Sequence, residues 1–203
     1  MQYPFRWLAS LALLLLAGCA SMPSGPSLPP STPELHQQHL ETVARIKSFK
    51  LQGRIGVQTA AKGFSGSTQW RHAASNDDIA LFSPLGSQVA TISRSPDGVS
   101  LKTSDNKAYQ AQDAETLTEQ NLGWRLPMTG LSDWALGKPS HTAIESSTWD
   151  EQGRLLTLKQ DGWDIEYGQY VLADGYQLPS KITLRSAQLT LKLIVQQWQS
   201  LNQ

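Results

Sequence analysis

The chain has 203 residues, with 17 basic and 17 acidic side chains and a single cysteine. A neutral balance without a basic block argues against nucleic-acid binding, which leaves a positive electrostatic footprint. One cysteine excludes a disulfide framework, so the fold depends on its apolar core. The length fits one compact domain once an N-terminal leader is set aside.

The N-terminus has the pattern of a secretory leader. Arg6 supplies a positive charge, and the apolar run from Leu8 to Leu16 is shorter than the ~20 residues that a membrane-spanning helix needs. The run closes on Leu16-Ala17-Gly18-Cys19, which resembles the lipobox of bacterial lipoproteins. That resemblance implies that residues 1–18 are a lipoprotein signal peptide, that this peptide is removed, and that Cys19 is acylated.

Two further observations bear on Cys19. A lone exposed thiol would be a liability in an oxidising compartment, and the chain has no second cysteine to pair with it. The alternative is an ordinary cleaved leader whose cysteine is incidental. Ala20 follows the cysteine, and in proteobacterial lipoproteins a residue other than aspartate at this position implies the outer membrane.

Residues 19–33 are rich in serine and proline. Such a segment buries too little apolar surface to fold, so it is predicted to be a flexible tether. Residues 34–203 are predicted to be the folded domain. Its first element is a helix predicted over 34–47, where apolar side chains recur without an internal glycine or proline at Leu35, Leu40, Val43 and Ile46.

After Ser48 apolar residues alternate with polar ones, and this period of two predicts β-strands. Strands are predicted at 49–58, 64–70, 79–82, 89–94, 99–103, 107–111, 154–159, 163–167, 179–184 and 189–196. Asp161-Gly162 predicts a tight hairpin. Between the two groups of strands, Asp113 is predicted to cap one short helix and Thr129 a second. Many evenly spaced antiparallel strands with three short helices indicate a barrel or a strongly curved sheet.

No residue pattern indicates catalysis, a metal site or a bound cofactor. His36 and His39 are three apart on the first predicted helix, but no acidic residue accompanies them, so a solvated pair is favoured over a metal site. The segment 63–67 lacks the final glycine of a nucleophile elbow and is predicted to be a flexible turn. Asp77 and Asp78 are predicted to lie in a solvated turn. The chain is therefore not predicted to be an enzyme.

The segment Ser83-Pro84-Leu85-Gly86-Ser87 joins two predicted strands. Pro84 fixes one backbone angle and Gly86 permits positive φ, so the segment is predicted to be a tight projecting turn with Leu85 at its tip. Two alternatives exist for a leucine at a hairpin tip. It can fold back on the domain, or it can dip into a bilayer or a partner.

Several segments of the chain, in this order, resemble the LolB family of outer-membrane lipoproteins. They are the lipobox, Gly53-Arg54-Ile55-Gly56, Gln69-Trp70, Pro84-Leu85-Gly86-Ser87, Leu131-Ser132-Asp133-Trp134-Ala135-Leu136-Gly137 and the strand from Trp163 to Tyr167. Each segment alone is moderately specific, whereas their order together with the lipobox is quite specific. Ser83 stands where the family has asparagine, which changes the turn but leaves the leucine in place.

The resemblance implies an unclosed antiparallel β-barrel of about 11 strands, mainly β, with three short helices that cap an apolar cavity. One face of the strands would then line the cavity. The candidate lining residues are Phe49, Leu51, Ile55, Trp70, Leu131, Trp134, Leu189, Leu191 and Leu193. The sequence leaves open whether each of them lines a cavity or packs in a solid core.

The resemblance also implies a function. A LolB-like protein receives acylated lipoproteins from the periplasmic carrier LolA and inserts them into the inner leaflet of the outer membrane. Its expected partners are that carrier, the acylated cargo and outer-membrane phospholipid. The protein is expected to be a monomer, lipid-anchored and facing the periplasm. Leu85 would be needed for membrane insertion, with Pro84 and Gly86 supporting the turn.

Two other classes of protein fit the same residues. A membrane-anchored binder of a free fatty acid or small hydrophobic ligand would use the apolar interior without any handover. A structural envelope lipoprotein would use neither the interior nor the tip. The apolar tip at Leu85 favours the transfer function, because a static binder has no need of it.

Overall fold

The computed structural model describes residues 32–202. The predicted signal peptide at 1–18, the predicted lipidation site Cys19 and the tether as far as residue 31 lie outside the described residues. Within residues 32–202, no helix is both long enough and apolar enough to cross a membrane.

The described residues form three helices and eleven strands. The helices are α1 (Pro33–Val43), α2 (Ala114–Leu122) and α3 (Met128–Ala135). The strands are β1 (Ser48–Thr59), β2 (Gly63–Ala73), β3 (Asn76–Phe82), β4 (Gln88–Ser95), β5 (Gly98–Thr103), β6 (Ala108–Ala111), β7 (Ile144–Trp149), β8 (Leu155–Gln160), β9 (Trp163–Ala173), β10 (Tyr176–Arg185) and β11 (Leu189–Asn202).

All eleven strands belong to one antiparallel sheet in the order β6-β5-β4-β3-β2-β1-β11-β10-β9-β8-β7. The end strands β6 and β7 do not pair with each other, so the sheet is curved but unclosed. The predicted fold, an unclosed antiparallel barrel with three short helices, is confirmed.

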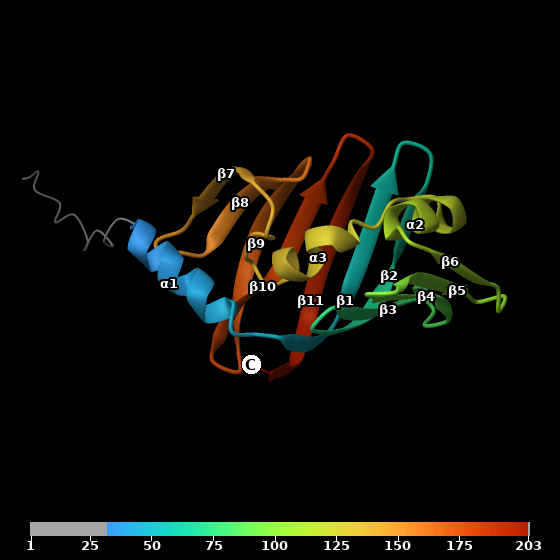
Figure 1. Ribbon diagram of the computed structural model, residues 1–203, viewed down its shortest axis with the longest axis horizontal. Helices are drawn as coiled ribbons and strands as arrows, with labels where there is room; N and C mark the ends of the chain where they lie inside the picture. Colours follow the sequence, from blue (N-terminus) through green and yellow to red (C-terminus); the bar gives the residue numbers. More distant parts are fainter. Residues whose placement is uncertain (1–31, 203) are drawn as a thin grey trace, which may run out of the picture.

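Two meanders of strands meet at the centre of the sheet, where β1 pairs with β11. Figure 1 shows α3 lying across the middle of one face, α2 at the β5–β6 end and α1 at the β8–β10 end. On β1 and β11 buried and exposed residues alternate along most of each strand. This is the pattern of a sheet with one face toward an apolar interior and one toward solvent.

Two glycines permit close approach between central strands. A Cβ at Gly53 would collide with the carbonyl oxygen of Ile194, and a Cβ at Gly66 with that of Phe82. Gly53 also lies at a shift of register between β1 and β11. Such a bulge bends a strand and increases its twist, which suits a sheet that must curve around an interior.

The helix ends show how far local signals decide structure. The predicted cap Asp113 is confirmed, since its carboxylate accepts hydrogen bonds from the backbone N–H groups of Glu115 and Thr116. The predicted cap Thr129 is wrong. The third helix begins at Met128, and Thr129 and Gly130 have non-helical backbone angles within it. Met128 is buried before this kink and Leu131 after it. The start of the helix is therefore set by the burial of these two side chains and not by a side-chain cap.

The strands were predicted well except at one edge. The tight turn predicted at Asp161-Gly162 is confirmed, because both residues have positive φ between β8 and β9. Strand β7 was missed. It is an edge strand without a fully buried residue, so it lacks the alternation that marks the others. The segment 63–67, predicted as a flexible turn, lies instead in β2.

The two histidines of α1 are not a solvated pair, contrary to the prediction. The His36 ring stacks on Trp149 with ring centroids 4.3 Å apart, and its Nδ1 lies 2.7 Å from the carbonyl oxygen of Gly153. His39 packs edge-on against Tyr170, and burial lowers the pKa of its imidazole. Both rings therefore dock α1 against the sheet and the β7–β8 turn.

The prediction that Asp77 lies in a solvated turn is also wrong. Its side chain is 2% exposed and accepts hydrogen bonds of 2.8 Å from Trp70 Nε1, His72 Nδ1 and Arg94 Nε. Burial by itself raises the pKa of the Asp77 carboxyl, but the hydrogen bonds from His72, Arg94 and Trp70 outweigh it and lower the pKa. The neighbouring Asp78 is exposed because successive residues of a strand face opposite sides.

We predict that Asp77→Asn lowers the free energy of unfolding by about 2–3 kcal/mol at neutral pH, because charge-assisted hydrogen bonds inside the sheet are lost. A carboxylate with a lowered pKa stabilises the fold above its ordinary pKa of 3.8 and ceases to do so as the pH falls through its folded value. The difference from the wild type should therefore shrink below that pH. Urea unfolding followed by tryptophan fluorescence measures both effects.

The matched control is Asp78→Asn, which removes an exposed carboxylate 3.8 Å from Arg71. Its effect should stay within about 1 kcal/mol. Equal losses for the two variants would contradict the role assigned to Asp77.

Candidate functional site

An apolar cavity lies between the centre of the sheet and the segment that leads into α3. Its volume is about 30 Å³. The lining residues come from β1, β2, β3, β11, α3 and the segment before α3, and are Ile55, Thr68, Trp70, Ile79, Leu81, Trp124, Leu126, Leu131, Leu191 and Leu193. The Thr68 hydroxyl donates to the carbonyl oxygen of Ala80, and the indole N–H of Trp70 donates to Asp77, so both polar groups are satisfied.

Five of the nine predicted lining residues meet at this cavity, namely Ile55, Trp70, Leu131, Leu191 and Leu193. The other four are buried but do not line it in its present closed form. Phe49 packs in an aromatic cluster with Trp70 and Trp198, at ring-centroid distances of 5.0 and 5.3 Å. Leu51 and Leu189 are buried elsewhere along their strands, and Trp134 faces β8.

Sequence reasoning missed the other half of the lining. Ile79 and Leu81 belong to a predicted strand, and their alternation with Ala80 was a usable signal. Trp124 and Leu126 lie between α2 and α3, where no periodicity marks them. The available signal was composition, because two large apolar side chains in a connecting segment need something to cover.

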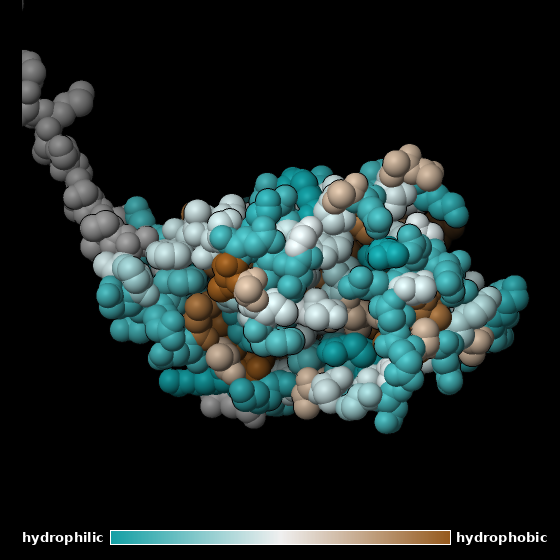
Figure 2. Space-filling view, turned by 45° about the horizontal axis from the view of Figure 1, so that its top comes forward, coloured by the Kyte–Doolittle hydropathy of each residue, from teal (hydrophilic) through white to brown (hydrophobic). Residues whose placement is uncertain are grey.

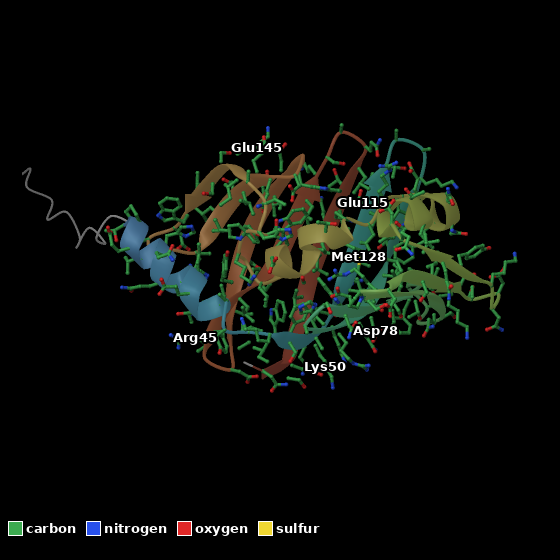
Figure 3. All side chains as sticks on the ribbon, viewed as in Figure 1. Arg45, Lys50, Asp78, Glu115, Met128 and Glu145 are labelled. Carbon is green, nitrogen blue, oxygen red and sulfur yellow. The ribbon has the colours of Figure 1, made fainter. Side chains whose placement is uncertain are left out.

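The closed cavity has the volume of about one water molecule in the liquid. Pockets for drug-sized ligands measure about 300–1,000 Å³. The cavity must therefore expand roughly tenfold before it can hold a long acyl chain. The helix α3 covers the interior here, since it lies across the face of the sheet and its Met128 lies over the strands (Figures 1 and 3).

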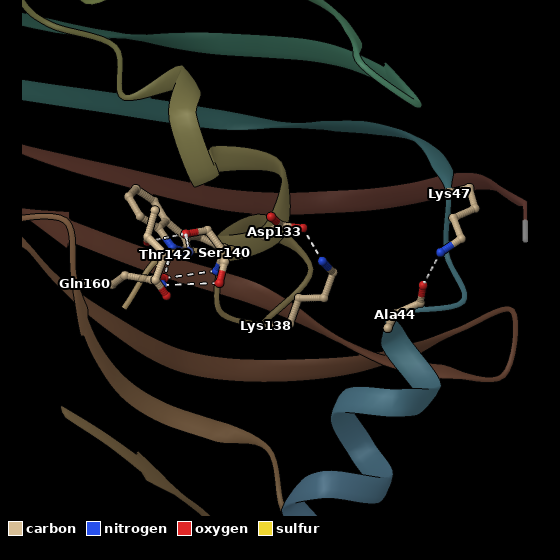
Figure 4. A network of polar contacts seen from close by, with 8 residues as sticks. Ala44, Lys47, Asp133, Lys138, Ser140, Thr142 and Gln160 are labelled. Atoms are coloured by element: carbon tan, nitrogen blue, oxygen red, sulfur yellow. Dashed lines mark hydrogen bonds and ion pairs between the residues drawn. The ribbon is translucent and has the colours of Figure 1, made fainter. Parts of the chain in front are cut away.

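A buried glutamine holds α3 in the closed position (Figure 4). The side chain of Gln160, on β8, is fully buried. Its Oε1 accepts from Trp134 Nε1 at 2.9 Å and from the backbone N–H of Ser140 at 3.0 Å, and its Nε2 donates to the carbonyl oxygen of Thr142 at 2.9 Å. One side chain thus joins the helix, the segment after it and the sheet.

One glycine lies within α3 at its kink, and a second follows the helix. Gly130 has φ of 80°, and a Cβ there would come within 2.9 Å of the Trp134 ring. Gly137 has φ of 76° just after the helix. Both conformations favour glycine, so the backbone turns sharply once within α3 and once just after it. An ion pair between Lys138 and Asp133 closes the C-terminal turn (Figure 4).

Leu85 lies outside the cavity at the tip of the β3–β4 hairpin, and it is 95% exposed. The backbone N–H of Gly86 donates to the carbonyl oxygen of Ser83 at 2.9 Å, which closes a β-turn with Pro84 and Leu85 at its centre. Gly86 has φ of 86°, as expected for a turn ending in a left-handed residue. Leu85 therefore projects from the domain and does not fold back on it.

Ser83 contributes a side-chain hydrogen bond to this turn. Its Oγ accepts from the backbone N–H of Ser87 at 3.2 Å, and the Ser83 N–H donates to the Ser87 carbonyl oxygen at 2.8 Å. Short polar side chains stabilise turns by bonding the backbone a few residues on, and serine does so like asparagine. The serine in this chain is thus compatible with the same tight turn.

Exposed apolar side chains are few elsewhere. Figure 2 shows a mostly hydrophilic face, with apolar residues gathered in two small patches, one beside α1 and one toward the opposite end. Within residues 32–202, no three histidine, cysteine, aspartate or glutamate side chains are grouped so that they could hold a metal ion. The arrangement offers an apolar interior covered by a helix and a separate apolar tip.

A curved, unclosed sheet with an apolar interior covered by a helix defines a class of proteins that enclose apolar groups. Comparison with known proteins gives the family. The family model described as "Outer membrane lipoprotein LolB" matches residues 47–198. Outer-membrane lipoprotein LolB of Pseudomonas paraeruginosa is 34% identical over 194 residues, which cover 95% of each chain. That of Nitrosomonas europaea is 36% identical over 199 residues, with 92% of this chain and 89% of the relative covered.

The chain belongs to the LolB family of outer-membrane lipoproteins. It is an outer-membrane lipoprotein with a role in lipoprotein localisation, and the family is one of transport proteins rather than enzymes. The fold extends further. A LolA superfamily protein from Nitrosomonas europaea is similar with a TM-score of 0.53 and 10% identity, covering 81% of this chain and 92% of that one. A DUF1329 family protein from Desulfovibrio piger gives 0.52 and 7%, covering 83% and 90%.

We predict that Gln160→Leu loosens α3. The substitution keeps the volume but leaves the Trp134 N–H and the Ser140 N–H without their acceptor, at a cost of about 1–3 kcal/mol in the free energy of unfolding. Amide hydrogen exchange should also rise in residues 128–142 more than in the central strands. Urea unfolding and exchange measured by mass spectrometry test the two effects.

Gln196→Leu serves as the matched control, since Gln196 is exposed on β11. Its free energy of unfolding should change by less than about 0.5 kcal/mol. Unchanged exchange at α3 in Gln160→Leu would show that this side chain does not hold the helix closed.

Proposed function

We propose that this protein receives acylated lipoproteins from the periplasmic carrier LolA in its apolar interior and inserts them into the inner leaflet of the outer membrane. Leu85 is the observation that carries the proposal. It is a fully projecting leucine on a tight hairpin, separate from the apolar cavity. A protein that only stored a ligand would need the cavity without the tip.

The energetics of acyl chains support a direct handover. Each buried methylene is worth about 0.8 kcal/mol, so three long chains represent on the order of 30 kcal/mol. Release of the cargo through water would therefore be prohibitively slow. An unclosed sheet with a movable α3 allows the lining to exchange contacts gradually, from the carrier's interior to this one and then to the bilayer. No step then exposes the chains fully.

The N-terminal residues would place the receptor at the right membrane. Acylation of Cys19 would anchor the protein in the outer membrane facing the periplasm, and residues 19–33 would provide reach. The monomer is proposed as the working form, because one chain contains both the interior and the tip. Pro84 and Gly86 would hold Leu85 in the orientation that meets phospholipid.

The decisive experiment is transfer. A chain that begins at Ala20 is mixed with purified LolA loaded with an acylated lipoprotein, and then with vesicles of outer-membrane phospholipid. We expect the cargo to move onto this chain and then into the vesicles. Absence of transfer, together with tight binding of a free fatty acid, would instead identify a static lipid binder.

We predict that Leu85→Glu receives cargo normally but delivers it to vesicles at least tenfold more slowly. Transfer of a leucine side chain from water to an apolar medium is favourable by about 1.5–3 kcal/mol. A carboxylate instead favours water, so the glutamate tip should resist entry into the bilayer. Because Leu85 is 95% exposed, the free energy of unfolding should stay within about 0.5 kcal/mol of the wild type. Rates of cargo transfer to the protein and to vesicles are measured separately.

The matched control is Leu172→Glu, which places the same charge at another exposed leucine, on β9. Delivery by this variant should equal that of the wild type. Normal delivery by Leu85→Glu would refute the insertion role of the tip.

A further inference from the structure

The four central strands of the sheet have a one-sided charge. Strands β10, β11, β1 and β2 contain six of the chain's 17 basic residues and none of its 17 acidic residues. The six are Lys50, Arg54, Arg71, Lys181, Arg185 and Lys192. All of them are exposed, and the strand registers place them on the same face of the sheet, the outer one, away from the interior. We call this surface the basic face.

Most of these charges have no counter-ion. Arg71 lies 3.8 Å from Asp78 on β3, and Arg185 pairs with Glu166 on β9 at 2.6 Å. Among the described residues the other four, Lys50, Arg54, Lys181 and Lys192, form no ion pair. Lys50 and Arg71 are direct cross-strand partners. Like charges opposite one another destabilise a sheet, so the fold carries a cost here.

A hollow of about 150 Å³ lies where these two cations meet on the outer face. Lys50, Arg71 and Asp78 border it, together with amide side chains from three strands, Gln52, Gln69 and Gln199. Figure 3 places Lys50 and Asp78 along the lower edge of the molecule, pointing outward. Ammonium, guanidinium and amide groups are the donors that bind phosphate oxygens.

An exposed isoleucine lies at the centre of the basic face. Ile194 is 46% exposed, and the register places Arg54 beside it on β1 and Lys181 beside it on β10. Lys192 is two residues away on the same strand and the same face. One apolar side chain surrounded by three cations is the pattern of a surface that settles on anionic lipid headgroups.

We propose that the basic face binds the anionic phospholipid surface of the membrane to which the protein is anchored, with headgroup phosphates at Lys50 and Arg71 and Ile194 at the level of the headgroups. An acidic protein partner fits less well, because stable protein interfaces have an extended apolar core and this face has one apolar residue. The inference depends on one element of the proposed function, the membrane anchor.

This contact would orient the receptor. The helix α3 covers the face of the sheet opposite to the basic face (Figure 1). With the basic face on the bilayer, α3 and the cavity face the periplasm, where a soluble carrier arrives. The electrostatic contact is weak enough to release, so the domain can turn on its tether and present the Leu85 tip for delivery.

The test uses the full acylated chain, reconstituted in vesicles of phosphatidylcholine with or without roughly one third phosphatidylglycerol. A fluorescent label is attached at Ser65→Cys, an exposed position on β2 within the basic face, or at Thr129→Cys on α3. Quenching by acrylamide, which is neutral, reports the access of water to each label. We expect phosphatidylglycerol to lower quenching at position 65 about threefold or more, to leave position 129 unchanged, and high salt to reverse the effect.

Charge variants make the test specific. Lys50→Gln, Arg54→Gln and Lys192→Gln, combined, should abolish the protection of the label at position 65. The control combines Arg45→Gln, Lys47→Gln and Lys62→Gln, which remove the same charge from exposed positions off the basic face, and it should keep the protection. Equal loss in both would show a general charge effect and overturn the proposal.

Two further outcomes would also overturn it. Equal quenching at position 65 in both kinds of vesicle would show that the face does not meet lipid. Protection at position 65 that appears only when purified LolA is added would assign the face to a protein partner. Labelling of the unsubstituted chain would reveal a free Cys19 thiol, and so a failure of the proposed anchor rather than of the basic face.

Discussion

The pairing of β1 with β11 is the contact on which the rest of the structure depends. These strands are far apart in the chain, and their ladder joins two meanders into one sheet of eleven strands. Their inward side chains, including Ile55, Leu191 and Leu193, form the floor of the apolar cavity. Gly53 permits the close approach of the two strands at the bulge. Without this ladder, neither half of the sheet could enclose an interior.

The sheet is unclosed because its two end strands, β6 and β7, do not pair with each other. A closed barrel would satisfy those edges but would fix the size of the interior. Here one side of the interior is covered by a helix, α3, that a few polar contacts hold in place. Gln160 supplies most of those contacts, and its burial ties the position of α3 to that of β8. A cavity this small keeps its apolar lining away from the surface, where it would favour aggregation.

In the proposed function, three surfaces of the molecule divide the work of transfer. The interior would bind acyl chains and release them to a bilayer, which is the larger apolar phase. Leu85 would meet that phase, because it is exposed at the tip of a hairpin that backbone hydrogen bonds close. The basic face lies away from the helices, where the central strands lack any carboxylate. The exposed leucine of the hairpin and the basic face thus belong to different parts of one small domain.

Much of the architecture could be predicted from sequence, because the responsible signals are local. Alternation of apolar residues identified ten of the eleven strands. Asp161-Gly162 identified a hairpin, because these residue types tolerate the positive φ angles that they have in the structure. The tip at Leu85 followed from Pro84 and Gly86 in the same way. Strand β7 was missed, since an exposed edge strand buries too little to show a period.

The sequence by itself therefore determined most of the strands, the tight turns and the family, whereas the projection of Leu85 from its turn was decided by the structure. Only the tertiary structure decided which apolar residues share a cavity. A residue that lines a cavity and a residue packed in the core have the same chemistry and differ only in whether another side chain contacts them. Trp124 and Leu126 line the cavity, whereas Phe49 packs in solid core. The burial of Asp77 and the start of α3 were decided in the same way. Each depends on contacts between segments that are distant in the chain, and no local pattern of residues contains that information.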